Sequence, residues 1–163
     1  MKIQILHLDE GIYPFSALAK PKSLDLNEDE FDREVWVQGE IEKRIDTLYF
    51  RFRVSTEAQH ACDRCLTEFR SPMNADCAFI GTSNQSLLEH DEDLRFFSRG
   101  QAELDITTEV RDSLLLAVPL KFLCKEDCKG ICPMCGSNLN EAQCDCKTQT
   151  IDPRWNALRK IAK

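Results

Sequence analysis

The sequence lacks any long apolar segment. Within its 163 residues, no run approaches the roughly 20 apolar residues that a membrane-spanning helix needs. The first 15 residues, MKIQILHLDEGIYPF, also lack the apolar core and cleavage site of a secretory signal, because Asp9 and Glu10 interrupt them. The sequence therefore predicts a cytoplasmic protein without a membrane partner.

The residue patterns of common enzyme sites are missing as well. The chain has only six glycines, and they form no glycine-rich phosphate loop. There is no serine nucleophile elbow and no metal-ligand set with an open coordination position. We therefore expect no enzymatic activity and no small-molecule substrate.

The chain also lacks an excess of positive charge, since its formal net charge is -7. The negative charge is concentrated in residues 1–121, whereas residues 122–163 carry a small excess of lysine and arginine. Because phosphate contacts need clustered cations, this distribution disfavours a general nucleic-acid-binding protein. It remains compatible with a local RNA contact or with a basic protein partner.

Apolar and polar residues alternate in three stretches of the chain. The apolar sides of these stretches are Val35, Val37, Gly39 and Ile41, then Leu48, Phe50, Phe52 and Val54, and finally Phe69, Met73, Ala75, Cys77 and Phe79. Period-two alternation is typical of strands with one buried face, so we predict an antiparallel meander of at least three strands. Short strands are expected at 3–8 and 93–98, with loop and a short helix over 9–32 and a polar loop over 81–93.

Two further helices are predicted. Asp105 suits the N-cap of a helix over 106–117, and Pro119 follows its end. A second helix is expected over 152–163, where an Asp-Pro pair supplies the N-cap and first position. The sequence thus predicts an α+β protein, with an antiparallel β-meander and helix in residues 1–121. Residues 122–163 would add a cysteine-rich zinc-binding segment, and the two parts would form one continuous domain.

Cysteine is abundant, and eight of the nine cysteines occur as close pairs. The pairs are Cys62 and Cys65, Cys124 and Cys128, Cys132 and Cys135, and Cys144 and Cys146. A reducing cytosol disfavours disulfides, and an odd number of cysteines fits a closed disulfide framework poorly. Closed structural zinc sites use four ligands each, so eight thiolates predict two structural zinc ions.

The grouping of the pairs and the role of the ninth cysteine follow from spacing. Cys77 has no nearby partner and lies on the apolar side of a predicted strand, so we assign it to the core. Because a short loop is easily closed, we favour one site of the last two pairs, and a second site that joins the first two. The alternative grouping places Cys124, Cys128, Cys132 and Cys135 together, and spacing leaves it open.

Two other cysteine chemistries fit the sequence less well. The spacing of Cys128, Cys132 and Cys135 matches the iron–sulfur cluster motif of radical enzymes, but these enzymes need a large barrel around the cofactor. Redox CxxC pairs usually open a helix in a βαβ unit, which the alternating pattern does not offer. A zinc-binding thiol redox or metal-handling protein remains the alternative function.

Five segments together resemble the YceD family of bacterial and plastid proteins, also named large ribosomal RNA subunit accumulation proteins. They are CDRCL at 62–66, AVPLKFLC at 117–124, EDCKGICPMCGSNLN at 126–140, CDC at 144–146 and DPRWNAL at 152–158. The resemblance implies a non-catalytic role in the accumulation, processing or stability of 23S ribosomal RNA during large-subunit assembly. The implied partner is the pre-ribosomal large subunit, through 23S ribosomal RNA or a basic large-subunit ribosomal protein.

The predicted C-terminal helix carries the most basic surface that the sequence indicates. Arg159, Lys160 and Lys163 lie opposite an apolar face that contains Trp155 and Leu158. We therefore predict that the apolar face docks on the body and that the three cations contact the partner or RNA.

Overall fold

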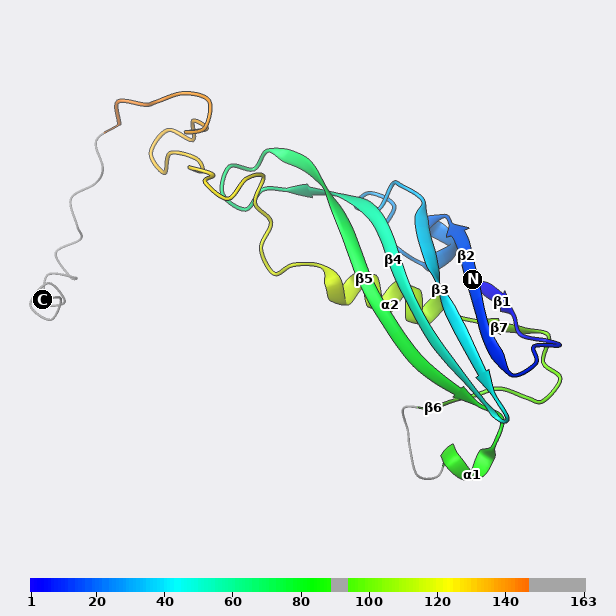
Figure 1. The fold of residues 1–163 in the computed structure, drawn as a ribbon. Coiled ribbons are helices and arrows are strands. Elements are labelled where there is room, and N and C mark those ends of the chain that lie inside the picture. The colour runs from blue at the N-terminus through cyan, green and yellow to red at the C-terminus, as the bar shows by residue number, and fades with distance from the viewer. Residues whose placement is uncertain (89–93, 147–163) are drawn as a thin grey trace, which may run out of the picture.

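The computed structural model describes residues 1–88 and 94–146 and contains two sheets (Figure 1). The larger sheet has the strand order β2-β3-β4-β5-β6, with β2 (Gly11–Ala19), β3 (Val35–Arg44), β4 (Thr47–Ala61), β5 (Glu68–Thr82) and β6 (Leu94–Phe96). Neighbouring strands are antiparallel except β5 and β6, which are parallel. The smaller sheet pairs β1 (Lys2–Gln4) with β7 (Glu103–Asp105).

Helices cover only part of the larger sheet. A 3-10 helix spans Pro21–Leu24, α1 spans Gln85–Leu88 and α2 spans Thr107–Ala117. Helix α2 lies across β5 and β4 on one face of the sheet (Figure 1). No helix in residues 1–88 or 94–146 is long and apolar enough to cross a membrane.

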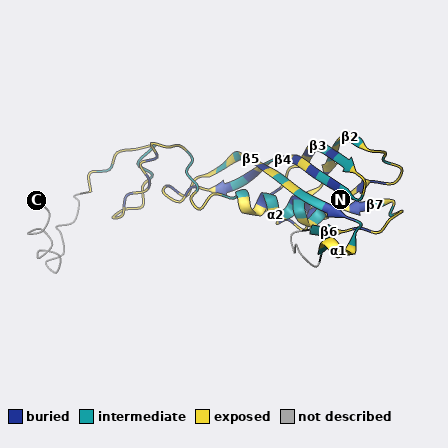
Figure 2. Cartoon of the chain, turned by 60° about the horizontal axis from the view of Figure 1, so that its bottom comes forward, coloured by how far each residue is buried: buried dark blue, intermediate teal, exposed yellow. Residues whose placement is uncertain are grey.

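The core lies between this face of the sheet and α2. Its fully buried side chains include Phe31, Val35, Val37, Leu48, Phe50, Val54, Ile106, Val110 and Leu114. Along β3 and β4 buried residues alternate with exposed or half-buried ones, so the opposite face of the sheet meets solvent (Figure 2). The core therefore depends on the period-two pattern of the central strands and on one apolar side of α2.

The sequence predicted the centre of this fold correctly. The three alternating stretches form β3, β4 and β5, and the predicted helix is α2. The helix begins one residue later than predicted, with Ile106 and not Asp105 at the N-cap position. Asp105 still accepts a hydrogen bond from the backbone N–H of Thr107 at 2.9 Å. Strand β6 lies within the predicted stretch 93–98.

The N-terminal part was predicted less well. Strand β2 lies where loop was expected, and the strand predicted over 3–8 is only Lys2–Gln4. Pro14 argued against a strand, but β2 is an edge strand, where a residue without an N–H group is tolerated. Strand β7 was also missed, because three residues are too few to show a periodicity.

The β4–β5 hairpin extends past the rest of the sheet and brings the cysteines of its turn to the cysteine-rich segment (Figure 1). Its pairing continues from Thr47 and Thr82 at one end to Ala61 and Glu68 at the other. The chain that follows α2 returns to this turn, where the N–H of Asp63 donates to the carbonyl of Phe122 at 2.9 Å. The N–H of Phe122 in turn donates to the Asp63 carboxylate at 2.7 Å. Both CxxC turns therefore lie at the same end of the molecule.

Gly39 allows β3 and β4 to approach each other closely. A Cβ atom at this position would lie 2.1 Å from the carbonyl oxygen of Arg51 and 2.4 Å from Cβ of Phe52. Phe15 and Phe52, which pair with Gly39 from the two neighbouring strands, have ring centroids 6.0 Å apart. The two rings thus pack across the position that lacks a side chain.

We predict that Gly39→Ala lowers the free energy of unfolding by about 1–3 kcal/mol. The added methyl group would push against the carbonyl oxygen of Arg51 and against Phe52, and so force β3 and β4 apart. Urea denaturation of the purified protein measures the change. Ser16→Ala, at an exposed position of β2, is the control and should change stability by no more than about 0.5 kcal/mol. Equal stability of Gly39→Ala and the wild type would show that the strands can separate freely at this point.

Candidate metal centres

Eight cysteines form two groups of four, and in each group all four Sγ atoms lie within 4.8 Å of one another. We name the group of Cys62, Cys65, Cys124 and Cys128 the hairpin site, since two of its members lie in the β4–β5 turn. We name the group of Cys132, Cys135, Cys144 and Cys146 the tail site. This is the grouping that loop closure favoured over the alternative.

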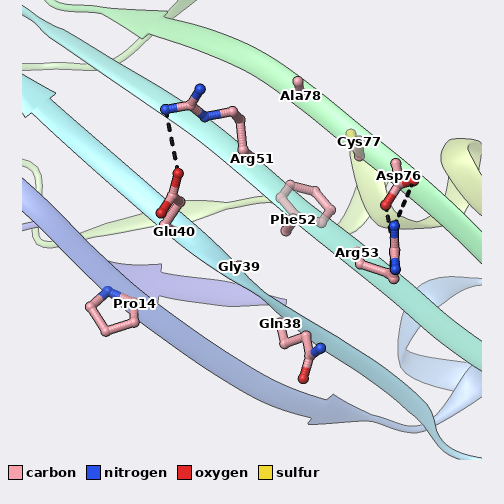
Figure 3. Close-up of a pocket in the computed structure, with 10 residues that line it drawn as sticks. All are labelled: Pro14, Gln38, Gly39, Glu40, Arg51, Phe52, Arg53, Asp76, Cys77 and Ala78. Carbon is pink, nitrogen blue, oxygen red and sulfur yellow. Dashed lines mark hydrogen bonds and ion pairs between the residues drawn. The ribbon is translucent and has the colours of Figure 1, made fainter.

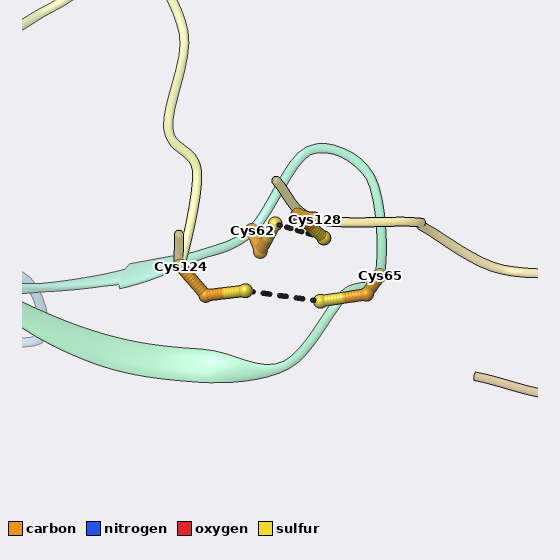
Figure 4. Close-up of side chains that lie close together, drawn as sticks. All are labelled: Cys62, Cys65, Cys124 and Cys128. Atoms are coloured by element: carbon orange, nitrogen blue, oxygen red, sulfur yellow. Dashed lines mark hydrogen bonds between the residues drawn. The ribbon is translucent and has the colours of Figure 1, made fainter. Parts of the chain in front are cut away.

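The hairpin site has the dimensions of a tetrahedral metal site (Figure 4). The Sγ atoms of Cys62 and Cys128 are 3.7 Å apart, and those of Cys65 and Cys124 are 3.6 Å apart. Four thiolates around zinc at about 2.3 Å would be about 3.8 Å from one another, whereas a disulfide is only about 2.05 Å long. All nine cysteines are free, so the donor set fits a thiolate-bound metal ion.

The two CxxC turns share one backbone pattern. In the first, the N–H of Leu66 donates to the carbonyl of Cys62 at 2.8 Å, and the N–H of Cys62 donates to the carbonyl of Thr67 at 3.0 Å. In the second, the N–H of Gly136 donates to Cys132 at 2.9 Å, and that of Cys132 donates to Ser137 at 2.8 Å. The residue after the second cysteine is left-handed in both turns, with φ of 60° at Leu66 and 73° at Gly136.

This pattern explains why each turn can bind an ion. The left-handed residue reverses the chain, and the turn then brings two thiols to one side. A leucine adopts this conformation at a cost of order 1–3 kcal/mol, which the surrounding contacts must offset. The sequence showed that both turns contain a CxxC pair, but not that their backbones have the same shape.

The two sites differ in burial. In the hairpin site Cys62, Cys65 and Cys128 are buried, and Phe69, Leu123 and Cys124 pack around them. In the tail site only Cys132 is buried, whereas Cys135 and Cys146 are exposed. The hairpin site is therefore shielded from solvent, while the tail site is accessible to reagents.

The thiols of each site influence one another strongly. Burial acts to raise the pKa of Cys62, but hydrogen bonds from the backbone N–H groups around it prevail and lower that pKa to about 6. Burial and the neighbouring Cys65 and Cys128 thiols raise the pKa of Cys124 to about 12. In the tail site the hydrogen bond with the Ser137 hydroxyl lowers the pKa of Cys135 to about 6. A first thiolate thus disfavours ionisation of its neighbours, and four thiolates together require a bound cation.

Of the remaining sequence-predicted residues, the structure describes only Cys77. Cys77 belongs to neither group; it is half-buried against the main core, and burial raises its pKa. Arg159, Lys160 and Lys163, together with the predicted helix over 152–163, lie outside the described residues. Their proposed contact with a partner stays a prediction.

Three residues around the sites were not assigned a role from the sequence. His60 is buried and its ring stacks on Phe122 with centroids 3.8 Å apart, so it supports the hairpin turn from the side of the sheet. Arg64 and Asn140 hydrogen-bond to Cys128, through its carbonyl and its Sγ atom respectively. Only a three-dimensional structure shows such contacts, because the residues that they join are up to 64 positions apart.

The solvent-facing side of the sheet has a shallow depression of about 580 Å³ (Figure 3). Its two arginines are both engaged with acids: Arg51 with Glu40 at 3.4 Å, and Arg53 with Asp76 at 2.7 Å. The depression therefore offers neutralised ion pairs to a ligand and lacks the free cations that phosphate binding requires.

Comparisons with known proteins agree on one family. The family model described as "Large ribosomal RNA subunit accumulation protein YceD" matches residues 50–162. One similar protein, from Arabidopsis thaliana, is named large ribosomal RNA subunit accumulation protein YCED homolog 1, chloroplastic. The chain is 36% identical to it over 70 residues, which cover 43% of this chain and 22% of that protein. It is 32% identical over 77 residues to the protein of the same name from Zea mays, covering 44% and 26%.

A bacterial relative is covered more fully. The chain is 28% identical over 133 residues to the uncharacterized protein YlbN of Bacillus subtilis, covering 79% of this chain and 74% of that protein. The two plant proteins, in contrast, are matched over only about a quarter of their own length. No solved structure matches the chain significantly.

We predict that the purified protein holds two metal ions per chain. Because a serine hydroxyl is a poor substitute for a thiolate, Cys62→Ser and Cys144→Ser should each retain one ion. Cys62→Ser should also lower the melting temperature more, since the hairpin site joins the sheet to the chain after α2. Elemental analysis with thermal denaturation measures both effects.

Cys77→Ala is the control for this experiment. It should keep both ions and lose only about 1 kcal/mol of stability, as expected for a small half-buried side chain. Loss of an ion in this variant would contradict the grouping of the eight cysteines, and so would a full metal complement in Cys62→Ser.

Proposed function

Since the chain belongs to the YceD family, we propose that it is a non-catalytic factor of ribosome biogenesis that supports the accumulation, processing or stability of 23S ribosomal RNA. The observation that carries this proposal is the family match over residues 50–162, which includes both metal sites. The names of the two plant relatives support it, although the chain matches only about a quarter of each. The proposed site of action is the cytoplasm.

The chemistry of the metal sites supports a structural role. A metal ion with four thiolate ligands has no free coordination position at which to activate water. Zinc is the ion we propose for both sites, because thiolates select it and it needs no redox partner. Its binding would replace apolar core that the loop-rich residues 122–146 do not supply, because binding to a site absent from the unfolded chain stabilises the fold.

The surface charge favours a basic protein as the direct partner. The chain has a net charge of -7, and the arginines on the solvent-facing side of the sheet are paired with acids. Such a surface repels phosphate, whereas it complements the positive charge of many RNA-binding proteins. We therefore propose a basic ribosomal protein of the large-subunit precursor as the partner.

Helix α2 and the residues after it provide an apolar surface for this partner. The helix buries Val110 and Leu114 against the sheet, but Leu115 and Leu116 on its other side are 48% and 86% exposed. Leu120, just after the helix, is fully exposed. A helix that covers a sheet normally presents polar residues to solvent, so an outer side of leucines indicates a binding surface.

Loss of the gene should lower large-subunit ribosomal RNA relative to small-subunit RNA, because precursors that lack the factor are degraded or stall. Sucrose-gradient profiles and the ratio of the two RNAs measure the effect. Wild-type protein supplied from a plasmid should restore the ratio. A normal ratio and normal subunit profiles in the deletion strain would contradict a role in ribosome biogenesis and favour the alternative, a thiol redox or metal-handling protein. The exposed Cys135 and Cys146 of the tail site are the observation that favours this alternative.

Leu116→Asp combined with Leu120→Asp should weaken co-migration with large-subunit precursors at least about tenfold, as expected for central apolar residues of an interface. Both side chains are exposed, so the melting temperature should stay nearly unchanged. Ile45→Asp, at a residue 79% exposed in the distant β3–β4 turn, is the matched control and should bind normally. Binding that survives the leucine changes but disappears after ribonuclease treatment would show that RNA, and not a basic protein, holds the factor.

A further inference from the structure

Residues 129–131 connect Cys128 of the hairpin site to Cys132 of the tail site, and they lie against the first CxxC turn. Arg64, between the first two cysteines, donates from its guanidinium to the carbonyl of Cys128 at 2.8 Å. The carbonyl of Arg64 accepts a hydrogen bond from the N–H of Ile131 at 3.0 Å. Gly130 has φ of 77°, and a Cβ atom there would lie 3.0 Å from the Arg64 carbonyl oxygen. The connection is therefore held tightly against the hairpin turn.

Asn140 makes a more direct link, since it belongs to the loop of one site and contacts a ligand of the other. It lies between Cys135 and Cys144, within the loop that the tail site closes. Its Oδ1 atom accepts the N–H of Lys129 at 2.9 Å, so its amide nitrogen must point the other way. That nitrogen donates to Sγ of Cys128, a member of the hairpin site, at 3.3 Å.

The loop is shaped to hold Asn140 in this position. Oδ1 of Asn138 accepts hydrogen bonds from the backbone N–H of Asn140 at 3.0 Å and from its side-chain amide at 2.9 Å. The N–H of Leu139 donates to the carbonyl of Gly130 at 2.9 Å, and Ile131 and Asn138 form a β-bridge. These contacts tie the loop to Gly130 and Ile131, directly before Cys132, and an ion in the tail site would close the same loop by joining Cys132 to Cys144.

We propose that the two metal sites are thermodynamically coupled and that Asn140 is the positioning residue that carries the coupling. An ion in the tail site closes the loop and fixes Asn140, and the amide then stabilises the negative charge on Cys128 Sγ. A hydrogen bond of this kind supports a metal ligand from outside the ligand set, and its loss typically lowers metal affinity about 10- to 100-fold. By linkage, an ion in the hairpin site must raise the affinity of the tail site by the same factor.

This coupling extends the metal sites beyond their structural role and does not depend on the ribosomal function. Because the coupling is reciprocal, each site reaches its full affinity only when the other is occupied, so the two ions bind cooperatively. Release of the tail ion would then weaken the link between the sheet and the chain after α2.

The test is a double-mutant cycle on the affinity of the hairpin site for zinc, measured by chelator competition on the full-length protein. One arm removes the tail site by Cys144→Ser with Cys146→Ser, the second is Asn140→Leu, and the third combines them. We expect each arm to lower the affinity at least about tenfold, and the combination to lower it no further. Removing the hairpin site by Cys62→Ser with Cys65→Ser should lower the affinity of the tail site by a similar factor.

Spectra of the cobalt-substituted protein provide a readout that a merely structural role would not change. Loss of the amide donor should shift the sulfur-to-cobalt charge-transfer band of the hairpin site in Asn140→Leu. Gln143→Leu, the same type of change at an exposed residue of the same loop, is the matched control and should leave spectrum and affinity unchanged. Asn140→Asp keeps the acceptor for Lys129 but places negative charge beside the thiolates, so it should weaken the site more than Asn140→Leu.

Three results would overturn the proposal. The first is an unchanged affinity of the hairpin site in the variant that lacks the tail site. The second is an additive loss in the combined variant, which would show that the coupling is carried elsewhere. The third is a wild-type protein without metal in either group, which would remove the metal sites themselves but leave the proposed ribosomal role intact.

Discussion

The meeting of the β4–β5 turn with the chain after α2 determines where residues 122–146 lie. Cys62 and Cys128 are 66 residues apart in sequence, yet their sulfur atoms are 3.7 Å apart. Few apolar contacts hold this end of the molecule, since the hairpin site has its own small cluster around Cys62 and Cys65, separate from the main core. A bound metal ion would therefore supply much of the free energy that keeps the cysteine-rich segment attached.

The position of this contact also shapes the surface that a partner would meet. The chain that returns from α2 to the hairpin turn has neither helix nor strand over residues 118–123, and Leu120 in this segment is fully exposed. The leucines on the outer side of α2 continue this apolar strip next to an acidic body. Membership of the YceD family, the net negative charge and these exposed leucines support our proposal of a factor that binds a basic component during assembly.

The two CxxC turns have the same backbone geometry but differ in burial and in the parts of the chain that they connect. The hairpin turn is buried and connects distant parts of the chain, whereas the tail turn is exposed and closes only a local loop. Asn140 connects the two, because its side chain is oriented by the loop of one site and reaches a sulfur of the other. In our proposal, an ion at the exposed tail site influences the shielded hairpin site through this hydrogen bond.

The sequence by itself determined the elements that repeat a simple physical pattern. Period-two alternation identified β3, β4 and β5, and the helical spacing and Asp105 identified α2. The close pairs of cysteines identified the eight residues of the two candidate metal sites. It favoured the correct grouping because short loops close easily, but loop entropy alone left a rival grouping open. It missed β2, whose Pro14 is tolerated only because the strand lies at the edge of the sheet. Only the tertiary structure decided that Cys62 meets Cys128, that Asn140 reaches this sulfur and that Leu116 is uncovered. Each of these depends on contacts between residues far apart in the chain, and such contacts leave no periodic signal in the sequence.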